Sequence, residues 1–246
     1  MNIASFDILM QLLRDRSTFL TEIEQQKQLD RKIISLLFCS SIFLALYGAI
    51  IGSTNGILQT VASAFKLPAL YLLTLLICLP TLYFLDIIFG SKRIFTQYLA
   101  LLMASMALIS VMLFGFAPIT LFFRLSINDY RFFILLNLIV LILTGIIGIK
   151  FFYRSMLCLI EQEEKSEQEA KLASSKDNLV EVKLLRNRHK LIKAWLFLYG
   201  IVGSQLGWTL RPFFGYPEIP FTLFRKIESN FYVEVLKIIS TLLGLN

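Results

Sequence analysis

The chain has 246 residues, of which 57% are hydrophobic and only 17% are charged. A water-soluble domain has about 45–50% apolar residues, so this composition excludes an ordinary soluble protein and indicates a chain that uses lipid as its solvent. The formal net charge of +7 accompanies long apolar runs, so we expect an anionic membrane surface as its partner and no nucleic acid.

Residues 1–32 form the first predicted element, a cytoplasmic amphipathic helix. The short apolar stretch Phe6–Leu13 is followed at once by Arg14, Asp15 and Arg16, a pattern that does not fit a cleaved signal peptide. The helical spacing of apolar residues indicates a helix that either lies on the membrane surface or packs on another cytoplasmic helix. The apolar positions are Phe6, Leu9, Met10, Leu13, Leu20 and Ile23.

Five long apolar segments follow, and each is close to the roughly 20 residues that a helix needs to cross a hydrocarbon core of about 30 Å. Backbone polar groups in lipid must be satisfied within the segment, so these spans are expected to be helices. The fold class is therefore all-α, a polytopic transmembrane helix bundle. The apolar segments are residues 33–57, 70–89, 98–119 and 132–152, within a region 33–154, and residues 194–210, within a region 193–213.

The distribution of Lys and Arg predicts the orientation of these spans. With a cytoplasmic N-terminus, the inner segments carry 17 of the 24 Lys and Arg residues, and the outer segments carry 7. Cytoplasmic loops of membrane proteins are enriched in these residues, so we expect the N-terminus inside and the C-terminus outside. The expected location is a bacterial inner membrane.

Residues 155–192 are predicted to form a cytoplasmic helical hairpin. Glu–Lys pairs at i,i+4 spacing support its first helix, and a capping pattern that begins at Ser174 opens its second. The hairpin is either a solvated charged face or a docking surface for a partner through an apolar stripe on its second helix. That stripe consists of Leu179, Val180, Leu184 and Leu185.

The last predicted element is an extracytoplasmic tail, residues 214–246. The stretch 211–226 contains three prolines and four phenylalanines, so it cannot form one regular helix. Residues 231–245 are predicted to form a final helix that is too short to span a bilayer comfortably. We expect this helix to lie at the outer interface or to pack against the bundle.

Small residues in two spans predict close helix packing. Gly48, Gly52 and Gly56 recur every four residues in the first span, and Gly200, Gly203 and Gly207 lie on one face of the fifth. Such faces let another backbone approach closely. They serve either ordinary packing within the bundle or, alternatively, a dimer seam or a groove for a lipid chain.

Arg211 is the candidate lipid or anion contact. It lies four residues beyond Gly207, where the fifth span leaves the membrane, and Trp208 and Tyr216 fit the interfacial aromatic belt. Arg211 either anchors the span to headgroups or binds a lipid phosphate or a substrate carboxylate. A salt bridge to Glu218 is a third possibility.

Three polar residues are predicted within the membrane. Asp86 lies near one end of the second span, where we expect it to pair with Lys92 or Arg93. Asn137 and Gln205 are amides that we expect to form hydrogen bonds between helices.

The residue types of catalytic and metal sites are scarce. Cys39, Cys78 and Cys158 lie in or beside apolar runs without metal-ligand spacing, and His189 is the only histidine. A two-histidine metal site and a Ser–His or Cys–His nucleophile therefore lack their partners. No phosphate-binding glycine motif occurs. We expect no catalytic residue, no metal site and no cofactor, and hence no enzyme.

The five spans over residues 33–210, the cytoplasmic N-terminus and the glycine- and proline-bearing helices resemble the Yip1-type family of multi-pass membrane proteins, particularly its bacterial relatives. The resemblance implies a scaffold or organiser that acts through other membrane proteins. Our first hypothesis is therefore a non-enzymatic scaffold, assembly factor or accessory subunit, whose partners are membrane lipids, other membrane proteins or further copies of itself. The alternative is a lipid-binding or transport protein with a groove near Arg211.

Overall fold

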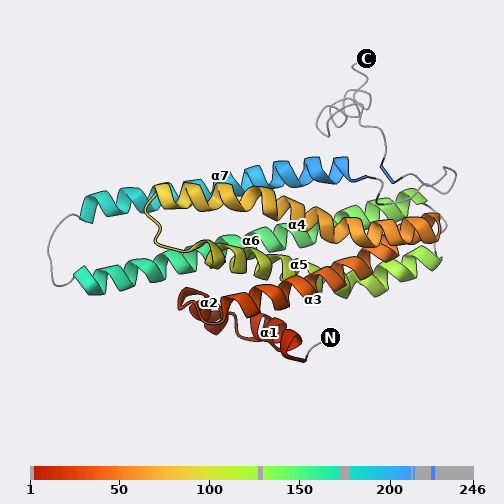
Figure 1. Cartoon of the computed structure of the whole chain (residues 1–246). Coiled ribbons are helices and arrows are strands. Elements are labelled where there is room, and N and C mark those ends of the chain that lie inside the picture. The colour runs from red at the N-terminus through yellow and green to blue at the C-terminus, as the bar shows by residue number, and fades with distance from the viewer. Residues whose placement is uncertain (1–2, 127–129, 172–177, 212, 214–222, 225–246) are drawn as a thin grey trace, which may run out of the picture.

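The computed structural model describes residues 3–126, 130–171, 178–211, 213 and 223–224 (Figure 1). The regular structure in these ranges is entirely helical, which confirms the all-α class. Side chains are described outside residues 3–5, 130–131, 164–171 and 178–189. Tyr216, Glu218, His189, the predicted helix 231–245 and the stripe of the hairpin therefore lie outside the described side chains.

Four helices are long and apolar enough to cross a membrane, as in a multi-pass membrane protein. The fifth predicted segment is helical too, within α7 (Asn178–Thr209), but α7 is not among these four because Lys193, Gln205 and several glycines dilute its apolar character. The four are α3 (Leu29–Gly52) with the short 3-10 helix η1 (Ser53–Asn55), α4 (Ile57–Ile88), α5 (Phe95–Ser126) and the part 132–163 of α6 (Tyr130–Lys171).

The turn between the first two spans differs from the prediction. α3 ends at Gly52, and α4 begins at Ile57, well before the predicted start at residue 70. Gly56 lies in the turn itself with φ +89°, a conformation that glycine adopts without steric penalty. The first turns of α4 contain the polar residues Gln59, Ser63 and Lys66. They lower the hydropathy of this part of the helix, so the prediction from hydropathy did not include it.

The N-terminal segment forms two short helices instead of one. α1 (Ile3–Arg14) and α2 (Arg16–Glu24) meet at Asp15, whose carboxylate accepts hydrogen bonds from the Thr18 backbone N–H at 3.2 Å and from its hydroxyl at 2.6 Å. These bonds lower the pKa of Asp15. The segment packs on the long apolar helices themselves, since Leu9, Leu12, Phe19, Leu20 and Ile23 are buried, whereas the predicted apolar positions Phe6, Met10 and Leu13 are exposed.

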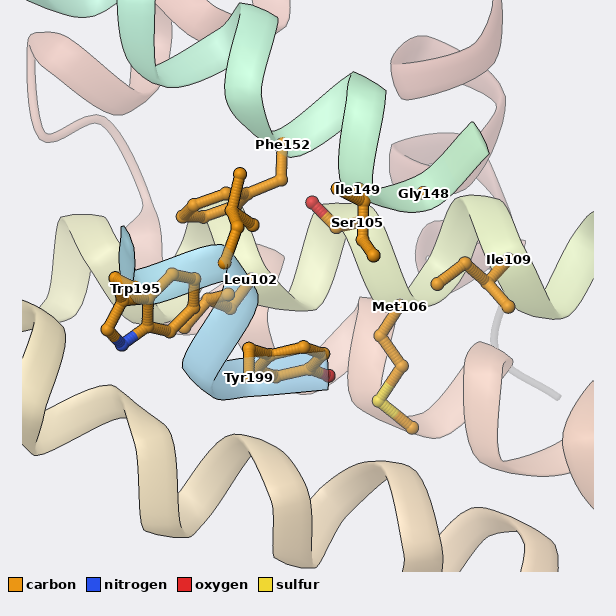
Figure 2. A pocket seen from close by; sticks show the side chains of 10 residues that line it. Leu102, Ser105, Met106, Ile109, Gly148, Ile149, Phe152, Trp195 and Tyr199 are labelled. Carbon is orange, nitrogen blue, oxygen red and sulfur yellow. The ribbon is translucent and has the colours of Figure 1, made fainter. Parts of the chain in front are cut away.

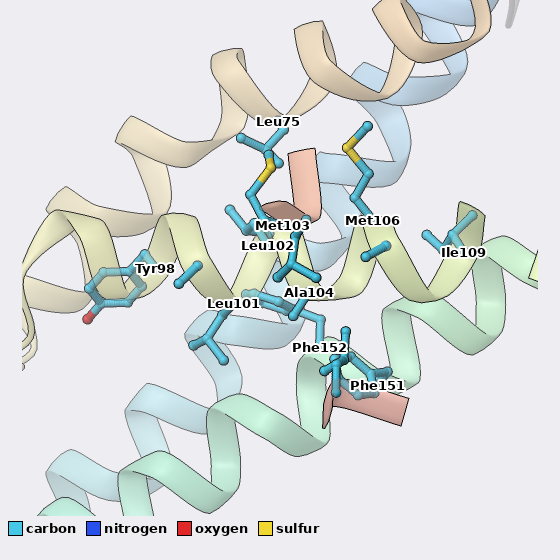
Figure 3. Close-up of a cluster of buried hydrophobic side chains, with 14 of the residues drawn as sticks. Leu75, Tyr98, Leu101, Leu102, Met103, Ala104, Met106, Ile109, Phe151 and Phe152 are labelled. Carbon is cyan, nitrogen blue, oxygen red and sulfur yellow. The ribbon is translucent and has the colours of Figure 1, made fainter. Parts of the chain in front are cut away.

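α5 is the central helix of the bundle. In its most apolar stretch 61% of the residues are buried, against 28–39% in the other three candidate spans. It packs most extensively on α3 and also on α6, and α4 in turn packs on α3 and α7. The small side chains of Ala100, Ala104 and Ala107 are fully buried along α5. Leu101 and Met103 are buried too and leave α5 on different sides, Met103 toward Leu75 of α4 (Figure 3).

α6 is the longest helix, and its end and the start of α7 both lie outside the bundle. These two ends extend beyond the turn that joins α4 to α5 (Figure 1). α6 continues without interruption to Lys171, and α7 begins at Asn178. Two helical arms therefore occupy the region in which the sequence predicts a hairpin.

Candidate functional site

A buried group of charged and polar residues lies where the α4–α5 connection meets α6, and we call it the Arg93 cluster. Its members are Asp86, Ser91, Arg93, Tyr98 and Glu163. The Arg93 guanidinium lies 3.8 Å from the Asp86 carboxylate and 3.0 Å from the Glu163 carboxylate. The side chain of Asp86 is fully buried, and that of Arg93 is 6% exposed. One cation thus bridges carboxylates from α4 and α6.

Two hydroxyl groups complete the cluster. The Tyr98 hydroxyl donates to Asp86 Oδ2 at 2.5 Å, and the Ser91 hydroxyl lies 2.7 Å from the Tyr98 hydroxyl. The backbone N–H of Ser91 also donates to the Asp86 carbonyl at 3.1 Å, which closes the turn after α4. Gly90 supplies the positive φ of +89° that this turn requires. Local chain geometry therefore places Ser91 and Arg93 against the carboxylate of Asp86.

Ion pairs and hydrogen bonds compensate the buried charges of the cluster. A buried charge is tolerated when an opposite charge and hydrogen bonds surround it. Of the two cations that the sequence offered to Asp86, Arg93 forms the ion pair. Glu163 also accepts a hydrogen bond from the backbone N–H of Lys92 at 3.0 Å. Sequence reasoning missed Glu163, since it lies 70 residues from Arg93 along the chain and no local spacing connects the two.

The N-terminal helices are tied to the same end of the bundle. The Gln97 side chain on α5 donates to the carbonyls of Ile23 and Glu24, both at 3.1 Å. Arg16 donates to the Ser155 hydroxyl at 2.9 Å and to the Phe151 carbonyl at 3.2 Å, and it lies 4.3 Å above the Phe151 ring. α2 is thus joined to α5 and to the start of the hairpin.

An ion pair joins α2 to the start of α3. Lys32 is buried and donates to the Glu22 carboxylate at 2.6 Å, and Gln11 of α1 donates to the same oxygen at 3.0 Å. The hydrogen bond from Lys32 holds the pKa of Glu22 below its usual value. Burial raises the pKa of Glu24 nearby, and the positive charge of Arg93 opposes that shift.

Asn137 lies at a buried junction of three helices. Its side-chain oxygen accepts a hydrogen bond from the Tyr47 hydroxyl of α3 at 2.8 Å, and its amide N–H donates to the Phe133 carbonyl at 2.8 Å. The Tyr47 hydroxyl also lies 3.5 Å from that of Thr120 on α5. This is an interhelical hydrogen bond of the kind that the sequence predicts for Asn137. The second amide, Gln205, is half-buried on α7.

The glycines of the first span lie against α4 of the same chain. A methyl group at Gly48 would lie 2.5 Å from the Ser63 carbonyl oxygen, and one at Gly52 would lie 2.7 Å from the Gln59 carbonyl oxygen. Close packing therefore occurs at both positions, with α4 as the partner. Gly56, predicted on the same face, lies in the turn after α3 and has no described neighbour within 4 Å.

The glycines of α7 lie in more open surroundings. A methyl group at Gly203 would contact Thr74 of α4 at 3.5 Å, an ordinary van der Waals distance. At Gly200 and Gly207 no atom of the described residues lies within 4 Å of the corresponding position. This face of α7 is therefore filled less completely than the glycine face of α3.

Arg211 lies just after α7, and its guanidinium stacks 3.4 Å above the Trp208 ring. The Arg211 Nε atom is buried and has no hydrogen-bond partner among the residues that the structure describes. The chain that follows is held by α4, because Ser63 and Gln59 donate to the Phe213 carbonyl at 2.6 Å and 3.2 Å.

Lys66 completes this polar face of α4. It donates to the Leu223 carbonyl and lies 5.0 Å above the Phe224 ring. Sequence reasoning missed Gln59, Ser63 and Lys66, although their spacing of four and three residues is typical of one helix face.

The chain matches no protein-family model, and no curated protein and no solved structure matches it either. The function is therefore argued from the geometry of this chain. The resemblance to the Yip1-type family stays a prediction.

Proposed function

We propose that the chain is a non-enzymatic scaffold, assembly factor or accessory subunit of a membrane complex, and that the α6–α7 hairpin is its partner-binding element. The observation that carries the proposal is the Arg93 cluster. Through Glu163 it attaches α6 to the α4–α5 turn, at the point where α6 leaves the bundle. Beyond Glu163, α6 continues for eight residues, or about 12 Å.

Rigid attachment favours binding of a partner. A loosely tethered hairpin loses conformational entropy when it binds, whereas a hairpin that is fixed at its base has lost most of that freedom already. Arg16 adds a second attachment through Ser155 and Phe151. The charged, helical arms then present their predicted apolar stripe at a defined distance from the membrane.

The contacts of α7 with α4 support five spans. The Trp195 indole donates to the Cys78 carbonyl at 3.0 Å, and Phe213, beyond the end of α7, accepts from Ser63. Cys78 and Ser63 are 15 residues apart on α4, or about 22 Å along its axis, against a hydrocarbon thickness of about 30 Å. A segment that accompanies a transmembrane helix over such a length shares its solvent.

Five spans place the N-terminus and the hairpin on one side and the C-terminus on the other. The excess of Lys and Arg assigns the hairpin side to the cytosol, in keeping with a bacterial inner membrane. The less completely filled face at Gly200 and Gly207 is then available to a helix of another membrane protein or of a second copy. A Yip1-type relationship fits this role.

The test is co-purification from native membranes with the proteins that elute quantified by mass spectrometry. The double variant Leu179→Gln, Leu184→Gln changes the predicted stripe, and Glu181→Gln on the same helix is the matched control. We expect the double variant to insert into the membrane normally and the amount of co-purified partner to fall at least about tenfold. The control should retain the partner. Elution of all three as stable, isolated monomers would contradict the proposal.

A further inference from the structure

A shallow, partly open groove lies between α5, α6 and α7 (Figure 2), and its unfilled space of about 350 Å³ includes the part that is open to the surroundings. Met106 and Ile109 line it from α5, Gly148 and Phe152 from α6, and Trp195 and Tyr199 from α7. The groove exists because α7 packs mainly on α4 and contacts α6 only over a short stretch. The Ile109 side chain packs directly on Gly148, where a methyl group would lie 2.4 Å from it, so α5 and α6 are in close contact at this end of the groove.

Three aromatic rings in tilted contact line one end of the groove. The Phe152 and Trp195 ring centroids lie 5.3 Å apart, and those of Trp195 and Tyr199 lie 5.4 Å apart. A hydrogen bond from the Trp195 indole to the Cys78 carbonyl holds that ring in place. The opposite wall contains Met106, whose flexible thioether adapts to the shape of an occupant.

The lining offers hydrocarbon contacts and few free polar groups. The Trp195 N–H is used by Cys78, and the Ser105 hydroxyl donates to the Leu101 carbonyl at 3.0 Å. Apart from the Tyr199 hydroxyl, these are the polar side-chain groups of the lining, so the groove favours an apolar ligand over a polar one. Along α5 the groove extends from Leu102 to Ile109, or about 10 Å, about a third of a hydrocarbon core.

We propose that this groove binds a segment of one acyl chain of a bilayer phospholipid. Its α5 and α6 walls belong to two of the four helices that are apolar enough to span a membrane. In a membrane, lipid acyl chains surround such helices. The helix of a second copy, about 10 Å across with its side chains, does not fit a space of this size. The site is independent of the scaffold role and of Arg211, which lies beyond the end of α7, whereas Tyr199 is 10 residues, or about 15 Å, before that end.

The test uses Trp195 as the reporter. The chain has two tryptophans, so the full chain with Trp208→Phe leaves Trp195 alone. Phosphatidylcholine with brominated acyl chains is titrated into this protein in detergent micelles. A chain in the groove contacts the Trp195 ring, so we expect quenching of about half or more of the fluorescence that saturates near one lipid per protein.

Two variants place a larger side chain in the groove, Ser105→Leu on α5 and Leu196→Phe on α7. We expect each of these two filled variants to abolish the saturable quenching if the groove is the site. Ile142→Phe on the exposed face of α6 is the matched control and retains it. Because the two filled variants lie on different helices, one that fails to fold leaves the other to decide. Quenching that rises in proportion to the lipid fraction and is equal in all variants means an outer lipid shell only, and overturns the proposal.

Discussion

Asp86 is a fully buried carboxylate near the end of a membrane-spanning helix, and three groups stabilise its charge. Arg93 pairs with it, the Tyr98 hydroxyl donates to it at 2.5 Å, and Ser91 orients that hydroxyl. Removal of one partner from a buried ion pair destabilises a protein by about 3–5 kcal/mol, since a charge then stays buried without compensation. At the scale of single residues, the Arg93 cluster is therefore the most sensitive point of the molecule.

Tyr98→Phe removes the hydroxyl and keeps the ring. We expect the free energy of unfolding to fall by about 1–3 kcal/mol, because a buried carboxylate oxygen loses its donor. Thermal unfolding in detergent, followed by circular dichroism, measures the change. Tyr83→Phe is the control, as the Tyr83 ring packs 5.8 Å from that of Tyr98 and this contact is preserved. Equal stability of the two variants would argue that the hydrogen bond contributes nothing.

At the scale of elements, the contact between α3 and α4 explains why small residues recur in the first span. The backbone of α4 at Ser63 lies so close to Gly48 that even a methyl group would clash with it. The same approach brings Gln59 and Ser63 under the chain that follows α7, where they bind the Phe213 carbonyl. The close packing of α3 on α4 thus positions the polar face of α4 that binds the chain after α7.

Gly48→Ala and Gly200→Ala are chemically identical changes with opposite expected results. Alanine favours a helix over glycine by about 1 kcal/mol, so Gly200→Ala, where no described atom lies within 4 Å, should leave the melting temperature unchanged or raise it. Gly48→Ala should lower it, because the helices must separate. Melting temperatures of the purified proteins in one detergent decide the question. A similar shift in both would refute the intrachain role of Gly48.

At the scale of the whole molecule, several polar contacts between described residues join segments at one end of the bundle. Gln97, Arg16, Lys32 and the Arg93 cluster join α1, α2, the α4–α5 turn and α6 there. The α6–α7 arms start from this end (Figure 1). In the proposed role the bundle is a platform for these arms, and the side of the membrane on which they lie decides which partners can reach them.

A topology experiment checks that arrangement. Reporter tags inserted after residue 175 and at the C-terminus should report opposite sides of the membrane, with the first in the cytosol. The reason is the excess of Lys and Arg on the hairpin side together with an odd number of spans. Protease protection of spheroplasts provides the measurement, and a tag at the N-terminus should agree with the tag at 175. Both insertions on one side would eliminate the five-span arrangement.

The sequence by itself determined the helical class and, of its five predicted spans, four apolar helices long enough to span a membrane, because hydropathy and backbone satisfaction in lipid are properties of each segment alone. It also indicated the interhelical hydrogen bond of Asn137 and the pairing of Asp86 with a nearby cation. Only the tertiary structure decided that Glu163 joins Arg93 and that Gly48 faces Ser63. Hydropathy did not reveal the early start of α4 either, since its polar residues are buried against segments far along the chain.

The α5–α6–α7 groove belongs to the same category. Its lining residues are ordinary apolar side chains of three separate helices, and no spacing within any one of them marks a site. The physical reason is common to all these cases. A partner that is distant in sequence is selected by which helix faces meet in space, and that depends on all the packing contacts at once.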